Sequence, residues 1–155
     1  MKKYIAMVLC LGMILLATAC DPGSFYFDAE DLKENVVEIS LIDYENPEAK
    51  ELFENREGVL PFDFDKMTVI KTLPAERHEE FLEEFCKTEF LMTWRHLDSP
   101  KGKSLMLTYS DGQFEIISLN EKFACGYNED GSLDFFIGEI AYSTGLQELV
   151  NRYFE

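Results

Sequence analysis

Apolar and polar residues alternate along several short segments of the chain, and this alternation predicts strands. Between residues 36 and 44, Val37, Ile39 and Leu41 are apolar while the residues between them are polar. A period of two residues is typical of a strand with one face in a core. Other short apolar runs, bounded by turn sequences, predict further strands at 66–73, 90–96, 104–110, 113–119, 122–127 and 133–140.

Two other segments have apolar residues at helical spacing. They cover residues 75–87, which follow a proline and begin with acidic residues, and the C-terminal residues 143–155. Proline and acidic side chains both favour the first turn of a helix. A short acidic stretch at 28–35 predicts one helical turn. Together these elements predict an α+β fold: a curved, mostly antiparallel sheet of roughly five to seven strands with one or two helices packed on a face.

The first residues of the chain have a different pattern. Lys2 and Lys3 precede an uncharged, mostly apolar run of 16 residues, Tyr4–Ala19. This run is shorter than the roughly 17–25 residues of a membrane-spanning helix, and it fits the apolar region of a signal peptide. It ends in small residues immediately before Cys20. The segment therefore predicts export from the cytoplasm.

The residues Leu16-Ala17-Thr18-Ala19-Cys20 resemble the lipobox of bacterial lipoproteins, a short run of apolar and small residues that ends in an obligatory cysteine. The third residue before the cysteine is usually leucine in that family, and here it is Ala17. The resemblance implies that Cys20 carries a diacylglyceryl group and becomes the N-terminus after cleavage. Two acyl chains anchor a protein stably where one does not. The alternative is a plain secreted protein in which Cys20 is coincidental.

A second resemblance covers most of residues 35–155. The stretches NVVEISLIDYENP, LPFDFDKMTVIKTL and WRHLDSPKG are similar to a group of small, uncharacterised secreted or membrane-anchored proteins of Gram-positive bacteria. The resemblance implies a location and a domain type, and no activity.

The predicted organisation is a signal peptide at 1–19, a lipid-anchored tether at 20–27 and one globular domain at 28–155. Within the tether, the aromatic run Phe25-Tyr26-Phe27 has two interpretations. It either lies at the level of the lipid headgroups, where aromatic residues are enriched, or forms a short first strand that packs on the domain.

The charge of the chain restricts its partners. There are 30 acidic residues against 14 Lys and Arg, a net charge of −16, and all of the acids follow Cys20. Such a surface repels phosphate backbones and anionic lipid headgroups, which argues against nucleic acid as a partner. A cationic peptide, a basic protein or a divalent cation remains compatible with it. The alternative is that the acids only keep the domain soluble.

The most suggestive polar cluster is Trp94, Arg95, His96 and Asp98. Arg95 could bind a carboxylate, and the imidazole of His96 titrates near neutral pH. The alternative is an aromatic core residue beside a surface ion pair. Because neither interpretation requires catalysis, we predict an interaction cluster and no catalytic residue.

The cysteines and histidines of the mature chain predict no metal site or cofactor. Cys86 and Cys125 either form a disulfide, which an extracytoplasmic protein permits, or are two buried thiols. The chain has only 2 histidines, and His78-Glu79 lacks the second histidine of a His-Glu-x-x-His zinc motif.

These features together predict a non-enzymatic binding domain that is anchored by lipid at the outer face of the cytoplasmic membrane. Two alternatives remain: a structural component of the cell envelope, and a small extracytoplasmic enzyme centred on His96.

Overall fold

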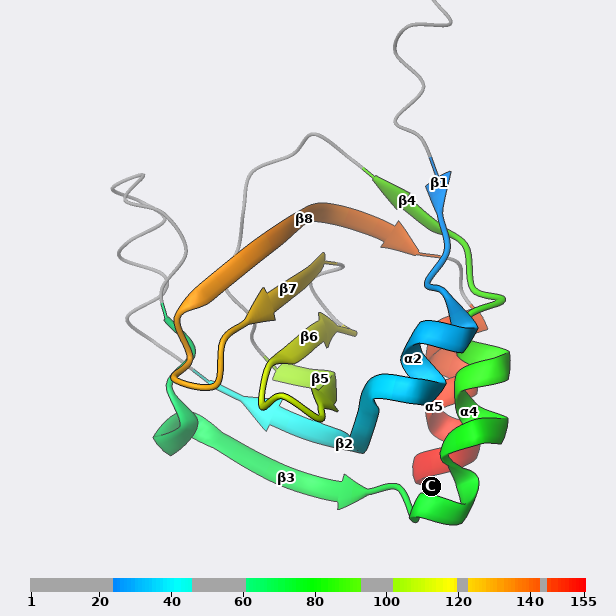
Figure 1. The fold of residues 1–155 in the computed structure, drawn as a ribbon, viewed down its shortest axis with the longest axis horizontal. Helices are drawn as coiled ribbons and strands as arrows, with labels where there is room; N and C mark the ends of the chain where they lie inside the picture. Colours follow the sequence, from blue (N-terminus) through cyan, green and yellow to red (C-terminus); the bar gives the residue numbers. More distant parts are fainter. Residues whose placement is uncertain (1–23, 46–60, 93–101, 120–122, 143–144) are drawn as a thin grey trace, which may run out of the picture.

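The strands of the domain form one strongly curved antiparallel sheet with helices gathered at one end of it (Figure 1). The computed structural model describes residues 24–45, 61–92, 102–119, 123–142 and 145–155. In these residues the sheet has the strand order β1-β4-β8-β7-β6-β5-β2-β3, and every neighbouring pair is antiparallel. The predicted α+β class with a curved antiparallel sheet is confirmed.

The strands are β1 (Ser24–Phe25), β2 (Val36–Tyr44), β3 (Met67–Thr72), β4 (Phe90–Met92), β5 (Gly102–Tyr109), β6 (Phe114–Ser118), β7 (Phe123–Tyr127) and β8 (Leu133–Tyr142). The α-helices are α2 (Ala29–Asn35), α4 (His78–Phe85) and α5 (Gly145–Phe154). Two short 3-10 helices, η1 (Phe64–Lys66) and η2 (Ala75–Arg77), precede β3 and α4.

The described part of the chain has one more strand and one more helix than the upper limits of the prediction. The additional strand is β1, which has only 2 residues. The additional helix is α2, which extends over 7 residues because both of its ends are satisfied. At its start the Asp28 carboxylate accepts hydrogen bonds from the backbone N–H groups of Glu30 and Asp31, at 2.9 and 3.2 Å. Such a cap stabilises a helix that is too short to form alone.

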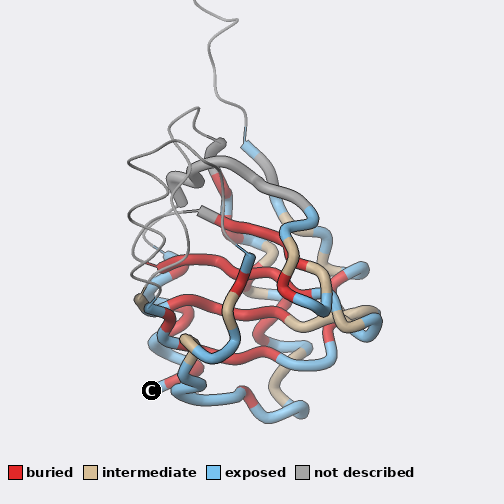
Figure 2. The backbone as a smooth tube through the Cα atoms, turned by 90° about the vertical axis from the view of Figure 1, so that its left-hand side faces the viewer, coloured by how far each residue is buried: buried red, intermediate tan, exposed pale blue. Residues whose placement is uncertain are grey.

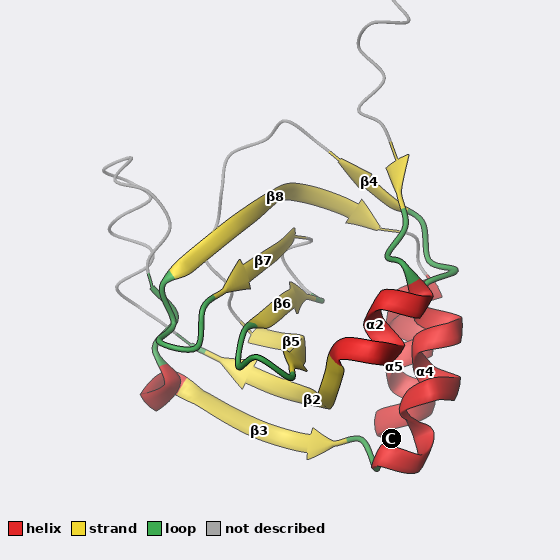
Figure 3. Ribbon diagram, in the orientation of Figure 1, coloured by secondary structure: helices red, strands yellow, loops and turns green. Residues whose placement is uncertain are grey.

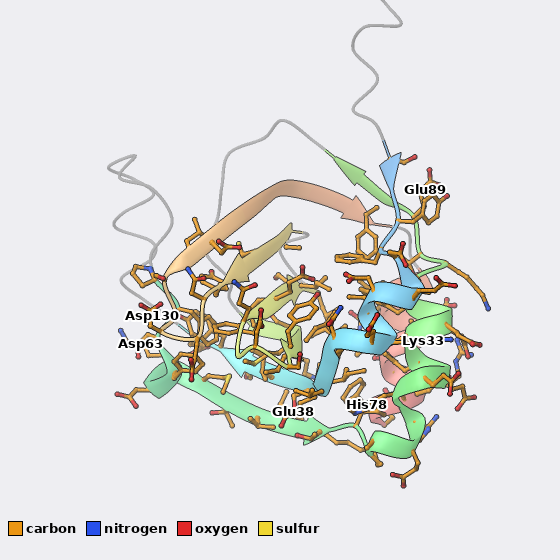
Figure 4. All side chains as sticks on the ribbon, viewed as in Figure 1. Lys33, Glu38, Asp63, His78, Glu89 and Asp130 are labelled. Atoms are coloured by element: carbon orange, nitrogen blue, oxygen red, sulfur yellow. The ribbon has the colours of Figure 1, made fainter. Side chains whose placement is uncertain are left out.

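Helices α2, α4 and α5 pack beside one another against one face of the sheet (Figure 3). In Figure 4, Lys33 of α2 lies beside α4, where its Nζ is 2.6 Å from Glu83 Oε1. The helices bury an apolar stripe against alternate residues of the central strands. The residues of this first core include Leu32, Phe81, Phe85, Leu149 and Val150 from the helices and Ile39, Leu41, Leu105, Leu107 and Ile117 from the strands.

The opposite face of the central strands carries a second core that is rich in aromatic rings. The ring of Phe62 stacks on Tyr44 with centroids 4.4 Å apart, and it contacts Phe114 edge-on at 5.2 Å. Tyr127 stacks on Phe114 at 5.2 Å. Because both faces of the central strands are covered, all five residues of β6 and the middle of β5 are buried, and buried segments run through the centre of the domain in Figure 2.

Residues 24–27 belong to the folded domain, although the tether was predicted to extend to residue 27. Strand β1 pairs with β4, with Ser24 opposite Leu91. The ring of Phe27 packs against Phe85 and Phe90, at centroid distances of 5.1 and 5.2 Å. Of this aromatic run, Phe25 therefore lies in a first strand and Phe27 packs on the domain, whereas Tyr26 is exposed. Among the described residues, no helix is both long and apolar enough to cross a bilayer.

Candidate functional site

A carboxylate, Glu115, lies within the central strand β6 of the sheet. All five residues of β6 are buried, and Glu115 is only 9% exposed. It faces the helical side, on which its neighbour two residues along the strand, Ile117, belongs to the first core. Burial of an ionised carboxylate without a charge partner is costly, so a residue of this kind marks a candidate functional site.

The strands beside Glu115 leave space around it. Its cross-strand partner on β7 is Gly126, which has no side chain to fill the adjacent surface. Its partner on β5 is Leu107. A cavity of about 350 Å³ opens here, and Glu115, Gly126 and residues of α2 and of the β5–β6 turn line it. This volume lies within the range of small-molecule sites.

The helix α2 and the β5–β6 turn are joined at the cavity by a backbone hydrogen bond. The N–H of Ser110 donates to the carbonyl oxygen of Asn35 at 2.8 Å. The amide of Asn35 in turn donates to the Asp31 carboxylate at 2.9 Å. The turn itself is closed by Gln113, whose N–H donates to the Asp111 carboxylate at 3.0 Å. The polar side chains at the cavity are thus held by elements that are anchored to one another.

The Glu115 carboxyl group has one protein partner, the Tyr109 hydroxyl, which donates a hydrogen bond to it. That bond is made to Oε1, because no donor among the described residues reaches Oε2, which is buried. Burial raises the pKa of Glu115 to about 7; the Tyr109 hydrogen bond opposes this rise, and the negative charge of Asp31 adds to it. Near neutral pH the group is therefore divided between its neutral and ionised forms.

The lining of the cavity is acidic. It contains four carboxylates, from Asp31, Asp111, Glu115 and Asp134, and none of its residues is Lys, Arg or His. Aromatic residues, Tyr109, Phe114 and Tyr127, complete much of the wall. A lining of this kind attracts a positively charged group. The described residues include no cluster of three or more His, Cys, Asp or Glu side chains placed to hold a metal ion.

A wider hollow adjoins the cavity and shares Asp111 and Gln113 with it. Its other lining residues are Asn128, Glu129 and Asp130, in the turn between β7 and β8. This turn is closed by Asp130, which accepts hydrogen bonds from the backbone N–H and the hydroxyl of Ser132, at 2.9 and 2.6 Å. The acidic surface therefore continues outward from the cavity over two hairpin turns.

The residues that were predicted as an interaction cluster, Trp94, Arg95, His96 and Asp98, lie outside the described residues. The same is true of Cys20, the predicted lipidation site. The structure therefore tests neither prediction.

The two other predicted site residues, Cys86 and Cys125, are free thiols in the structure. They lie on different faces of the sheet: Cys86 packs against the first core, and Cys125 belongs to the second. Burial raises the pKa of Cys86 to about 11 and that of Cys125 to about 12, so both are protonated at neutral pH. No disulfide joins them in the structure, and only Cys125 is fully buried, whereas Cys86 is partly exposed.

Glu115 was not among the predicted site residues, although the sequence contains a signal for it. The run Phe114-Glu115-Ile116-Ile117 places an acid in a segment that is otherwise apolar at every position. A central strand covered on both faces reads as a continuous apolar run, and an acid in such a run is buried. That inference requires knowing that β6 is central and covered on both sides, which the sequence pattern alone does not establish.

Comparisons of the chain with protein-family models, with curated proteins and with solved structures found no match. The function proposed below is therefore argued from this chain's own residues.

Proposed function

We propose that the protein is a lipid-anchored binding domain at the outer face of the cytoplasmic membrane, and that its acidic cavity beside Glu115 receives a cationic group of a basic peptide or protein. The observation that carries the proposal is the lining of the cavity, which contains the buried carboxyl group of Glu115, three further carboxylates and no basic side chain. The net charge of −16 acts in the same direction, because it increases the rate at which cationic partners meet the surface.

The chemistry of the lining supports binding over catalysis. Its side chains are carboxylates, amides, hydroxyls and aromatic rings, and no cysteine or histidine is among them. A nucleophilic mechanism needs a nucleophile within hydrogen-bond reach of a base that a third group orients. Recognition of a cation needs only acceptors and desolvated walls, and the cavity contains both.

The adjoining hollow supports a peptide or protein as the partner. Glu129 and Asp130 extend the acidic surface beyond the cavity. A cationic side chain that entered the cavity would therefore place neighbouring basic residues over further acids. Several such contacts together provide steering and orientation, although each exposed ion pair contributes little.

The lipid anchor is proposed on the resemblance of Leu16–Cys20 to a lipobox. Only Asp21, Pro22 and Gly23 separate Cys20 from β1. An extended chain of this length reaches about 14 Å. The anchor would therefore hold the domain close to the bilayer, where it would meet partners at the membrane surface.

The binding proposal can be tested by charge reversal in the hollow. The full-length protein, expressed at native abundance, is extracted from membranes in detergent, and its co-purifying proteins are identified. We expect a basic partner that is retained by a Glu148→Lys control on α5 and lost from a Glu129→Lys variant, because only Glu129 lines the hollow. Recovery of the protein alone, or equal retention by both variants, would contradict the proposal.

The anchor can be tested separately with Cys20→Ala. We expect this variant either to accumulate unprocessed or to leave the membrane fraction, because it has no thiol to receive the lipid. A processed Cys20→Ala protein that still sediments with membranes would contradict lipid anchoring.

A further inference from the structure

The unpartnered oxygen of Glu115 narrows the chemistry of the ligand. Oε2 is buried and accepts no hydrogen bond from the described residues, while the other oxygen is occupied by the Tyr109 hydroxyl. A buried acceptor without a donor is unfavourable in the free protein. Glu115 also lines the cavity, so a turn of its side chain would bring Oε2, which has almost no accessible surface, to a ligand donor on this side.

Resting on the proposed function, we infer that the cavity binds the ammonium group of an organic cation, such as a free alkylamine or a lysine side chain, with Glu115 as the innermost partner. Three further carboxylates, Asp31, Asp111 and Asp134, contribute to the wall around the same space. They lie on α2, on the β5–β6 turn and on β8. An ammonium group bound to Glu115 would thus be attracted by carboxylates from several elements.

The geometry favours ammonium over guanidinium. A guanidinium binds best to a carboxylate that offers both oxygens side by side. Glu115 cannot do this, because Tyr109 already uses one of its oxygens. An ammonium group has three donors that diverge, so it suits one oxygen of Glu115 together with oxygens of other residues.

The geometry also favours an organic cation over a metal ion. A bound divalent metal needs several oxygen ligands at short, fixed distances. The described residues place no three acidic, His or Cys side chains together in this way. The ring of Tyr109, which lines the cavity on the same face of the sheet as Glu115, suits the methylene groups of an alkylamine and attracts its charge.

Binding of the ammonium group is coupled to loss of a proton from Glu115. When the carboxyl group is neutral, it releases its proton to solvent as the ammonium group binds, and the resulting ion pair has no net charge. The described groups that act on Glu115 are the Tyr109 hydroxyl, on β5, and the Asp31 carboxylate, on α2, while Asp111 and Asp134 line the same cavity. A primary amine, with a pKa near 10, stays protonated throughout the range in which Glu115 titrates.

The affinity for an amine should therefore rise with pH. With a pKa of about 7, Glu115 is mostly neutral at pH 6 and mostly ionised at pH 8. The ionised fraction changes about tenfold over this interval, and the affinity should change by the same factor. A surface acid with an ordinary pKa is fully ionised at both values and gives no such dependence.

The test is an NMR titration of the full-length protein in detergent micelles at pH 6 and pH 8. The probes are n-pentylamine, Nα-acetyl-lysine amide, Nα-acetyl-arginine amide, n-pentanol and calcium chloride. We expect the two amines to shift the backbone amides of Glu115 and Gly126, with an affinity about tenfold higher at pH 8. The lysine probe should bind more tightly than the arginine probe. Tighter binding of the free alkylamine would indicate that the natural ammonium group belongs to a small amine. Tighter binding of the lysine amide would indicate that it belongs to a peptide or protein.

Two variants test the role of Glu115. Glu115→Gln should abolish the pH dependence and weaken amine binding at pH 8 about tenfold or more, whereas the matched control Glu148→Gln should change neither. If Glu115→Gln does not fold, Tyr109→Phe serves instead. Removal of the hydroxyl donor raises the pKa of Glu115 further, so the midpoint of amine binding should move to higher pH.

The outcomes separate this inference from the proposed function. Amine binding that is independent of pH and of Glu115, or preference for the arginine probe, pentanol or calcium, would overturn the inference. If a basic partner is still lost from Glu129→Lys in that case, the proposed function stands. If no cationic probe binds and no partner is found, both are wrong.

Discussion

Replacement of Glu115 by Gln should change how the stability of the protein depends on pH. The folded protein raises the pKa of this carboxyl group from 4.5 to about 7, chiefly by burial. Between these two values the folded state binds a proton that the unfolded state has lost. Stability from this group is therefore fully present below pH 4.5 and is lost as the pH rises toward 7.

The magnitude follows from the same shift. At about 1.36 kcal/mol per pH unit, a rise from 4.5 to about 7 corresponds to about 3 kcal/mol. Since Glu115 is only 9% exposed, solvent screening reduces this value little. Glutamine has nearly the same shape and does not titrate. Relative to wild type, Glu115→Gln should therefore be more favourable at pH 8 than at pH 4.5 by about 3 kcal/mol.

The assay is urea denaturation followed by far-UV circular dichroism at several pH values from 4.5 to 8. The many surface acids also titrate, so the quantity of interest is the difference in unfolding free energy between wild type and variant. Glu148→Gln on α5 is the control, and its difference from wild type should not vary in this way. If the difference for Glu115→Gln is the same at every pH, the carboxyl group has an ordinary pKa and the reasoning is refuted.

Two other parts of the structure make separate predictions. Cys86 and Cys125 should react slowly with a thiol reagent in the native protein, because burial raises the pKa of both thiols. Both should react fully once the protein is denatured without reductant. Two unreactive cysteines in the denatured protein would indicate a disulfide. Gly131→Ala should lower the unfolding free energy by about 1–3 kcal/mol, since the residue has φ +81° and a Cβ would lie 2.5 Å from a backbone carbonyl oxygen. Urea denaturation measures this loss, and an unchanged midpoint would contradict it.

Local patterns in the sequence predicted most of the fold. The alternation in residues 36–44 predicts the bounds of β2, and the apolar stripe in 75–87 predicts η2 and α4. The helix prediction succeeds because α4 buries one side against a core, which imposes its period on the sequence. Strand β2 instead contributes residues to both cores, and Val37, which the alternation predicted on the buried face, is exposed. The sequence pattern predicted the short strand β1 and the full length of α2 less well. Strand β1 forms because it pairs with β4, and α2 extends because Asp28 caps its start.

The candidate site was not predicted, for a physical reason. The cavity depends on three residues that lie far apart in the sequence: Asp31 on α2, Glu115 on β6 and Gly126 on β7. None belongs to a motif, and Gly126 matters only because pairing places it opposite Glu115. These residues are brought together by the pairing of β6 with β7 in one register. The sequence pattern does not specify which strands pair or in which register.

The most direct measurement of the central claim is a carbon-13 NMR titration of the Glu115 side-chain carboxyl, with and without n-pentylamine. In the free protein we predict a pKa of about 7, and addition of the amine should lower it, because the ammonium group stabilises the ionised form. A pKa near 4.5 that does not respond to the amine would contradict the proposal that Glu115 forms the floor of a cation-binding site.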